Sequence, residues 1–448
     1  MKTFLHPLQN LAEMEAIYTK AKSNRGILEI SGCMESQKAH LIYGLSGLFT
    51  SHLILAEDEK AAKELYEDYR FYDKNVYYYP AKDLLFFQAD IHGNLLIRQR
   101  MRVIKALLEQ KENITVVTSI DGCMDYLQPL DKIEKQLIHF RNDSTLDMDK
   151  LKDALVHMGY ERVGQVEMPG QFSIRGGIVD IYSLTEENPW RIELWGDEID
   201  SIRTFDSQSQ RSLENLDEIT IYPATEQPAE KGGVSFLDYF AEKNSLVFLD
   251  EPNRLEENAR AVEEEFRQSC ENRQQKGEEN ISQNWMCRWG DLNHKLNNRN
   301  CISVSLMEPK RADWKITEQF NLTVKSMSSY QSSFELLVKD LRQYKKQGYQ
   351  IVLLSGSRTR AERLAKDLQD EGLSAFYGQD FDRVLEPGEI MVAYGHARKG
   401  FEYPFIKFAI ITETDIFGKE QKKHKKKKEY NGKRIQDFSE LSIGDFVV

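Results

Sequence analysis

The chain has 448 residues, of which 40% are hydrophobic and 29% are charged, and its formal net charge is −12. This length predicts about three domains, since a domain commonly holds roughly 100 to 200 residues, and the acidic balance excludes broad nonspecific DNA binding by the whole surface. The five cysteines form no C-x-x-C pair and no long apolar run occurs, so we expect no disulfide framework, no zinc ribbon and no membrane span, in a cytoplasmic protein.

The N-terminal part alternates short β-rich runs with helical patterns. We predict strands at 26–31, 53–56, 76–79 and 114–118, and helices at 59–72 and 97–110. This alternation is typical of a parallel sheet whose strands are connected by crossover helices.

The first predicted strand ends at Gly32, and the loop that follows is similar to the phosphate-binding pattern G-x-x-x-x-G-K-[ST]. Lys38 occupies the position of the lysine in that pattern. Gln37 replaces the glycine that lets backbone amides wrap phosphates, and Ala39 lacks the hydroxyl that coordinates magnesium. The sequence therefore predicts a nucleotide-type fold with a degenerate, inactive phosphate site, and we expect no cofactor, no metal and no catalytic residue.

An antiparallel hairpin with one polar face is predicted within residues 170–206. In the run 191–195, the two-residue period of a strand places Arg191 and Trp195 on the same face, opposite the apolar residues between them. The Gly196-Asp197 pair that follows tolerates positive φ, which favours a tight turn. We expect the arginine and the tryptophan to be presented to solvent.

The residues alone leave two interpretations of this polar face open. In the first, Arg191 pairs with Asp200 across the hairpin, as a surface ion pair worth only about 0 to 1 kcal/mol. In the second, Arg175, Arg191 and Trp195 form the centre of a docking surface, because Arg and Trp dominate the residues whose truncation costs about 2 kcal/mol or more at interfaces. Spacing does not decide between these interpretations.

The same segment resembles the second domain of the bacterial transcription-repair coupling factor family, a module shared with the excision-repair protein UvrB and used by both to bind UvrA. The matching residues are Gly170, Phe172, Arg175 and Gly176 in the pattern G-x-F-x-x-R-G, the triplet Pro189-Trp190-Arg191, and the ungapped run 197–206. The resemblance implies that Arg175, Arg191 and Trp195 contact UvrA.

A second part of the predicted nucleotide fold follows this module. The apolar run 246–249 leads into Asp250 and Glu251, and P-loop enzymes hold magnesium with carboxylates at such a strand end. Many buried strands also end in this way without a function. In the coupling-factor family, the resemblance implies a UvrB-like first domain that is interrupted by the UvrA-binding module and does not bind nucleotide.

Residues 331–418 restart a β-α-β pattern that resembles the third domain of the family. We predict strands at 351–354, 390–393 and 408–412 and a helix at 358–370. The turn Ser355-Gly356-Ser357 is compatible with a phosphate site that uses Arg358 and Arg360. A simple turn capped by Ser357 is favoured, because no glycine-rich cradle accompanies it.

The C-terminal thirty residues are predicted to lack a folded core. The basic run 419–434 is expected to be a flexible linker, since its like charges repel one another. Residues 435–448 resemble the opening strand of the family's RNA-polymerase-interacting domain, and one strand cannot bury a core. We expect this domain to be truncated here.

The predicted fold class is α/β. Its parts are a discontinuous, degenerate P-loop NTPase-like (UvrB-like) parallel-sheet domain at 1–132 and 224–330, a small α+β UvrA-binding module at 133–223, a second α/β domain at 331–418, the basic linker at 419–434 and the truncated start at 435–448.

The resemblance implies the N-terminal portion of a transcription-repair coupling factor, which recruits UvrA to stalled RNA polymerase at DNA lesions for nucleotide excision repair. Full-length relatives are ATP-dependent DNA translocases, but the motor is absent here, so we expect no enzymatic activity and weak or no DNA binding. Two alternatives stay open. One is a nucleotide-dependent, UvrB-like damage-processing protein that uses Lys38, Asp250 and Glu251. The other is a structural scaffold whose arginine and tryptophan face packs internally.

Overall fold

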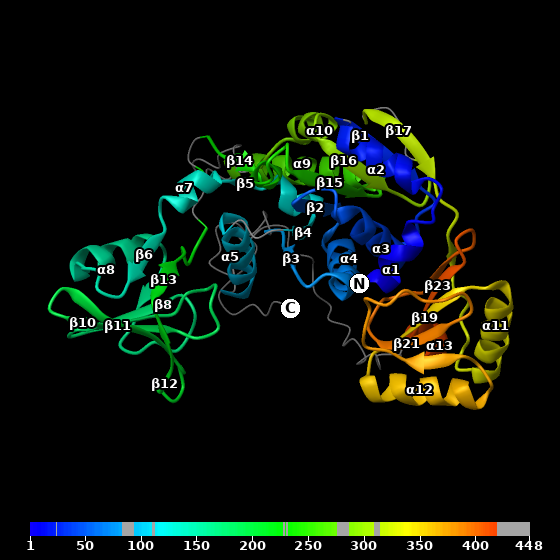
Figure 1. The fold of residues 1–448 in the computed structure, drawn as a ribbon. Helices are drawn as coiled ribbons and strands as arrows, with labels where there is room; N and C mark the ends of the chain where they lie inside the picture. The colour runs from blue at the N-terminus through cyan, green and yellow to red at the C-terminus, as the bar shows by residue number, and fades with distance from the viewer. Residues whose placement is uncertain are drawn as a thin grey trace, which may run out of the picture.

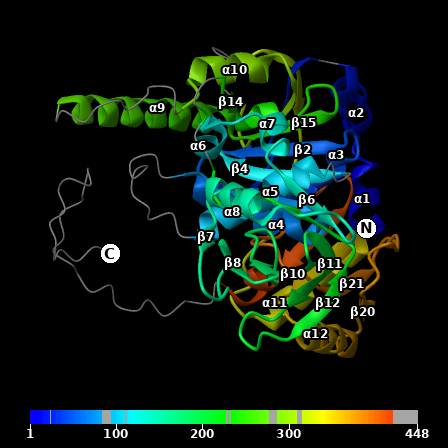
Figure 2. The same cartoon turned by 90° about the vertical axis from the view of Figure 1, so that its left-hand side faces the viewer.

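The structure is a computed structural model. It describes residues 1–23, 25–82, 94–109, 113–226, 229, 232–275, 286–308 and 314–418. Three large sheets organise these residues, and Figures 1 and 2 show them from two directions. The predicted linker at 419–434 and the segment at 435–448 lie outside the described residues.

The first sheet has seven parallel strands in the order β17-β1-β16-β15-β2-β4-β3. The strands are β1 (Gly26–Ser31), β2 (Ser51–Ala56), β3 (Val76–Tyr79), β4 (Ile114–Ser119), β15 (Ser245–Asp250), β16 (Asn300–Val304) and β17 (Ile316–Asn321). Every residue of β1, β4 and β15 is buried, as expected when helices cover both faces of a parallel sheet. The predicted parallel sheet is confirmed.

Helices cover both faces of this sheet. One face, with Ile54 and Phe248, packs against α1 (Lys2–Leu8), α2 (Met14–Ser23), α3 (Glu35–Ser46) and α4 (Glu59–Tyr72). The other face, with Leu53 and Val247, packs against α5 (Asn94–Leu108), α6 (Ile120–Met124), α9 (Pro252–Gln275) and α10 (Trp289–Asn297). Neighbouring residues of one strand therefore belong to different cores, which follows from the alternation of side chains along a strand.

The second sheet is mainly antiparallel, in the order β12-β11-β10-β9-β8-β7, with only the β7–β8 pair parallel. Its strands are β7 (Glu161–Arg162), β8 (Gln171–Arg175), β9 (Ile178–Ile181), β10 (Trp190–Trp195), β11 (Glu198–Phe205) and β12 (Ser212–Leu216). Helix α8 (Met148–His157) lies beside it, and the pair β6 (Ile138–Arg141) and β13 (Glu218–Ile221) adjoins it. One face carries Phe172, Val179 and Ile192, which are fully buried.

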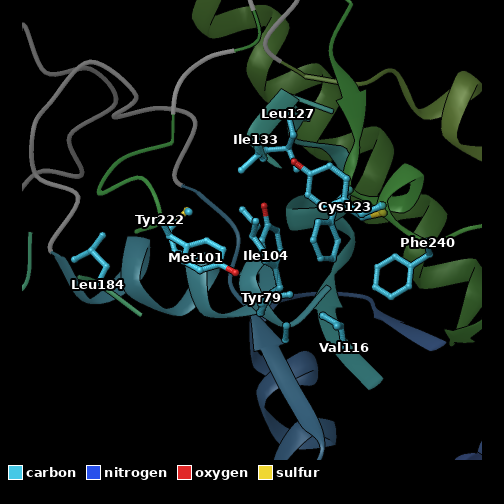
Figure 3. Packing of buried hydrophobic residues seen from close by; sticks show 14 of the residues in the cluster. Tyr79, Met101, Ile104, Val116, Cys123, Leu127, Ile133, Leu184, Tyr222 and Phe240 are labelled. Carbon is cyan, nitrogen blue, oxygen red and sulfur yellow. The ribbon is translucent and has the colours of Figure 1, made fainter. Parts of the chain in front are cut away.

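The junction between the first and second sheets is packed around α5. Figure 3 shows Met101 and Ile104 of this helix close to Tyr222. Arg100 of the same helix is fully buried and pairs with Glu226 at 2.5 Å. Burial alone would raise the pKa of the Glu226 carboxyl, but Arg100 and Lys82 lower it to about 2. Short elements complete this region: α7 (Leu130–Glu134), β5 (Tyr126–Leu127), β14 (Val234–Ser235) and a 3-10 helix at Phe236–Tyr239.

The third sheet has six strands in the order β18-β22-β23-β19-β21-β20. They are β18 (Lys325–Ser326), β19 (Gln350–Ser355), β20 (Ala375–Tyr377), β21 (Ile390–Tyr394), β22 (Phe401–Tyr403) and β23 (Phe408–Thr412). Helices α11 (Phe334–Gln347) and α12 (Arg358–Asp370) cover one face, and α13 (Glu413–Phe417) follows β23. The other face, which includes Leu354 and Met391, shares a continuous core with α1, α3 and α4.

A buried hydrogen-bond relay joins helices α1 and α3, which cover the first sheet, to β22 of the third sheet. The Gln37 Nε2 group donates to the Tyr403 hydroxyl at 2.8 Å, and that hydroxyl lies 3.2 Å from His40 Nδ1. His40 Nε2 lies 2.9 Å from the carbonyl oxygen of Phe4. Burial lowers the pKa of His40 to about 4, so the ring is neutral at physiological pH. A neutral ring that donates from Nε2 and accepts at Nδ1 satisfies every contact.

The cysteines and the possible metal ligands of the described residues do not form clusters. All five cysteines are free thiols, and burial raises the pKa of Cys33 to about 12. Within the described ranges, there is no group of three or more His, Cys, Asp or Glu side chains that could hold a metal ion. None of the described helices combines the length and the hydrophobicity that a membrane crossing requires.

The relay predicts the effect of removing one oxygen atom. In Tyr403→Phe, the Gln37 amide and the His40 ring each lose a buried partner, so we expect stability to fall by about 1 to 3 kcal/mol. Thermal unfolding measured by circular dichroism tests this. The control is Tyr394→Phe, because Tyr394 is half exposed and its hydroxyl forms no hydrogen bond with any described residue. Equal melting temperatures for both variants would contradict the relay.

Candidate docking surface and degenerate nucleotide site

The strand register brings the predicted docking residues onto one face of the second sheet. Arg191 on β10 lies opposite Asp180 on β9, and Asp180 lies opposite Ser173 on β8. Arg175 is two residues from Ser173, and Trp195 is four residues from Arg191, so both share this face. It is the face opposite the buried apolar residues, as the two-residue period predicted.

Two tight turns place Arg175 and Trp195 at the same end of the sheet. The β8–β9 turn contains Gly176 with φ +60°, and the β10–β11 turn contains Gly196 with φ +67°. These left-handed conformations favour glycine. The Leu194 amide donates to the Gly177 carbonyl at 2.8 Å and ties the two turns together.

The three predicted contact residues differ in exposure. Trp195 is 84% exposed, and the side chain of Arg175 is 48% exposed. The side chain of Arg191 is only 13% exposed. The expectation that Arg191 is presented to solvent is therefore wrong, because its guanidinium is occupied by contacts within the chain.

A single buried carboxylate, Asp180, organises both arginines. It accepts hydrogen bonds from Arg191 Nε at 2.7 Å and Arg191 Nη2 at 2.8 Å, and from Arg175 Nη2 at 2.8 Å. Arg191 also donates to Gln210 Oε1 at 2.9 Å, and its guanidinium lies 4.3 Å from the centre of the Phe205 ring. The hydrogen bonds to Asp180 raise the pKa of Arg191 further, so its charge is permanent.

The Arg191–Asp200 pair considered from the sequence is not formed. Arg203 is the residue opposite Arg191 across the hairpin, and it pairs with Glu193 instead. Sequence reasoning missed Asp180 as the partner of Arg191. The available signal was an acidic residue inside the apolar run Ile178–Ile181, because a buried carboxylate requires a partner.

The residues of the degenerate phosphate loop meet the second predicted fragment. Lys38 lies near the start of α3, and Asp250 and Glu251 lie at the end of β15, so both groups stand at the carboxyl edge of the parallel sheet. Lys38 Nζ lies 2.6 Å from Asp250 Oδ1 and 2.6 Å from Glu251 Oε1. Burial alone would lower the pKa of Lys38, but the two carboxylates raise it. The ammonium group is thus bound internally.

Other cations of the surrounding pocket are also paired with acidic side chains of the chain itself. Arg254 pairs with Glu57 at 3.1 Å, and Lys399 pairs with Glu35 at 3.1 Å. Arg398 pairs with Asp68 at 3.0 Å. A polyphosphate would have to displace these carboxylates to reach the three paired cations.

The remaining positions of the loop serve packing. Gly32 has φ +76°, and a Cβ atom there would lie 2.0 Å from the carbonyl oxygen of Leu322. Gln37 belongs to the relay with Tyr403 described above. Ala39 is fully buried in the core beneath α3. Gly32, Gln37 and Ala39 therefore make packing or hydrogen-bond contacts within the protein.

An internal carboxylate also fills the turn before α12. Glu413 accepts hydrogen bonds from the Gly356 amide at 2.6 Å and the Ser355 hydroxyl at 3.3 Å, and it pairs with Arg360 at 2.5 Å. Burial opposes these contacts, but together they lower the pKa of Glu413. Ser357 is the N-cap residue of α12, as predicted, but its side chain forms no capping hydrogen bond.

Comparison with known families identifies the second sheet and its surroundings. Residues 138–226 match the family described as the UvrB interaction domain. This range contains the whole second sheet and ends at Glu226, the partner of Arg100 in the junction. The chain is therefore a protein that carries a UvrB interaction domain.

Curated relatives cover most of the chain. The transcription-repair-coupling factor of Bacillus subtilis is 30% identical over 94% of this chain and 42% of its own length. Those of Staphylococcus haemolyticus and Staphylococcus epidermidis are 26% and 25% identical, over 83% and 84% of this chain and 36% and 37% of their own lengths. The chain spans less than half the length of these relatives. It corresponds to the N-terminal portion of the transcription-repair-coupling factor family.

The buried triad of Lys38, Asp250 and Glu251 predicts a pH-dependent defect. In Lys38→Met, two carboxylates lose their cation, and we expect a loss of about 3 to 5 kcal/mol at neutral pH. Burial raises the pKa of Asp250, and without Lys38 it rises further. The folded state then binds more protons than the unfolded chain, so the loss shrinks as the pH falls from 7 to 5.

Denaturant titrations at several pH values measure this defect. Lys60→Met is the matched control, because Lys60 lines the same pocket and forms no ion pair with any described residue. If the stability deficit of Lys38→Met stays constant with pH, the prediction that this variant leaves an uncompensated buried carboxylate is wrong.

Proposed function

We propose that this chain recruits UvrA through the polar face of its second sheet. The setting is transcription-coupled nucleotide excision repair in the bacterial cytoplasm, at RNA polymerase stalled by a DNA lesion. The proposal is supported by the match of residues 138–226 to the UvrB interaction domain and by the similarity to transcription-repair-coupling factors.

The exposure of Trp195 is the observation that carries this proposal. An indole that is 84% exposed on a hydrogen-bonded hairpin already has the geometry of an interface anchor. Burying such a side chain against a partner contributes roughly 1.5 to 3 kcal/mol or more, and the tight turn limits the entropy lost on binding. The half-exposed Arg175 at the same end of the sheet supplies hydrogen-bond donors beside this apolar anchor.

We also propose the domain boundaries that follow from this function. Residues 1–132 and 224–330 form a discontinuous UvrB-like domain, 133–223 form the UvrA-binding module, and 331–418 form the third domain. The strands of the first sheet come from both sides of the second sheet in the sequence, which supports the discontinuous arrangement. Strand β18 at Lys325–Ser326 belongs to the third sheet and precedes the proposed boundary at residue 331.

In this proposal the first domain is a degenerate nucleotide fold without ATPase activity. Lys38 is bound by Asp250 and Glu251, and Gln37 and Ala39 are buried in packing contacts. The rival function, a UvrB-like nucleotide-dependent enzyme, would require these contacts to open. We assign the contact with RNA polymerase and the motor activity to parts of the full-length relatives that lie outside the described residues. We expect this chain to bind DNA weakly or not at all.

UvrA capture by the purified chain tests the docking surface. We expect Trp195→Ala to weaken UvrA binding by at least about 30-fold, which corresponds to roughly 2 kcal/mol. The matched control is Phe405→Ala, because Phe405 is 81% exposed in the third domain, and it should bind UvrA like the wild type. The double variant Arg175→Ala, Arg191→Ala should also lose capture. Undiminished capture by both docking variants would mean that UvrA binds elsewhere or that the face is only structural.

Isothermal titration with ATP and magnesium tests the inactive nucleotide site. We expect no saturable heat for the wild-type chain, because the Lys38 ammonium already has two carboxylate partners. Tight binding that disappears in Lys38→Ala would refute this part of the proposal. Circular dichroism of the variant at the titration temperature establishes that the loss does not come from unfolding.

A further inference from the structure

We propose that Asp180 is a positioning residue of the docking surface: it holds Arg175 and Arg191 so that the unused donors of Arg175 face a carboxylate of the bound partner. This inference rests on the proposed recruitment of UvrA and assigns a role to a residue that does not itself meet the partner, since Asp180 is fully buried.

The hydrogen bonds of the three side chains define this role. Both oxygens of Asp180 are used, and Oδ2 accepts from Arg175 and Arg191 at the same time. Two guanidinium groups that share one carboxylate would repel each other without it. Asp180 therefore allows two permanent cations to stand together on one face of the sheet.

The donors that remain indicate what the partner supplies. Within the described part of the chain, Nε and Nη1 of Arg175 and Nη1 of Arg191 form no hydrogen bond. One carboxylate balances only one of the two cations, so the group keeps a formal charge of about +1. A guanidinium with free donors matches a carboxylate in charge and in planar geometry. The half-exposed Arg175 is the one that a partner can reach.

The neighbouring charged residues leave the net positive charge of Arg175, Arg191 and Asp180 at the end of the sheet where Arg175 lies. Arg203 is paired with Glu193 on the same face, so it adds no net charge. Glu198 lies opposite Trp195 at the tip of the hairpin. The face thus has a cationic part at Arg175 and an apolar part at Trp195. The complementary partner surface has an acidic side chain next to an apolar pocket.

The central test is Asp180→Asn, measured by the binding kinetics of immobilised UvrA. The asparagine keeps the shape but removes the charge, so both guanidiniums lose their fixed position. We expect UvrA to dissociate about tenfold faster, while association at low salt is unchanged or faster because the local positive charge increases. The control is Glu218→Gln, which breaks the exposed Arg141–Glu218 pair of the same module and should leave both rates unchanged.

A double-mutant cycle separates positioning from a general loss of structure. In the Arg175→Ala background, Asp180→Asn should change UvrA affinity by less than about twofold, because the guanidinium that faces the partner is absent and the remaining Arg191 is covered by Gln210 and Phe205. An equal loss in both backgrounds would overturn the proposal, and so would wild-type binding by Asp180→Asn. If wild-type chain fails to bind UvrA at all, the proposed function fails rather than this inference alone.

A second variant keeps the proposal testable if Asp180→Asn does not fold. Arg175→Lys leaves the Asp180–Arg191 pair intact and changes only a half-exposed side chain. A lysine keeps the charge but lacks the planar set of donors. We expect about tenfold weaker UvrA binding, and full binding by Arg175→Lys would overturn the proposal.

Discussion

Strands β15 and β16 lie between β1 and β2 in the first sheet, so the core of this sheet closes only after the chain has passed through the whole second sheet. The two ends of the UvrB interaction domain must therefore meet at the first sheet. The buried Arg100–Glu226 pair and the apolar contacts around α5 fix this meeting point. The second sheet is therefore packed directly against the first through this junction.

Polar contacts within the chain engage the side chains of the two turns for which the sequence suggested a phosphate site. Lys38 is bound by two carboxylates, Gln37 joins α3 to the third sheet, and Glu413 fills the turn before α12. The first and third sheets thus share a continuous core, and the hydrogen bond between Gln37 and Tyr403 adds a polar contact to it.

Local patterns predicted most of the fold. The strands at 26–31 and 76–79 and the helix at 358–370 have the predicted bounds, because apolar periodicity and turn residues are properties of short segments. The carboxyl-edge rule for parallel strands also explains why Lys38 meets Asp250, although 212 residues separate them.

Contacts that depend on distant segments could not be predicted. Periodicity placed Arg191 on the polar face of its strand, but it did not show that Asp180, Phe205 and Gln210 cover its guanidinium. The link between Gln37 and Tyr403 spans 366 residues, and no local pattern of either segment indicates the other. Sequence reasoning thus placed these residues on one face of a strand, while their exposure and partners required the folded chain.

The topology of the first sheet has a consequence for synthesis on the ribosome. Gly26 on β1 pairs with Asn300 on β16, so roughly 270 residues must be added before the first strand gains this neighbour. At about 5 to 20 residues per second, β1 waits roughly 15 to 50 s with its edges unpaired. The second sheet pairs strands that are close in sequence and can form during this interval. During this interval the unpaired edges of β1 can pair with strands of other chains.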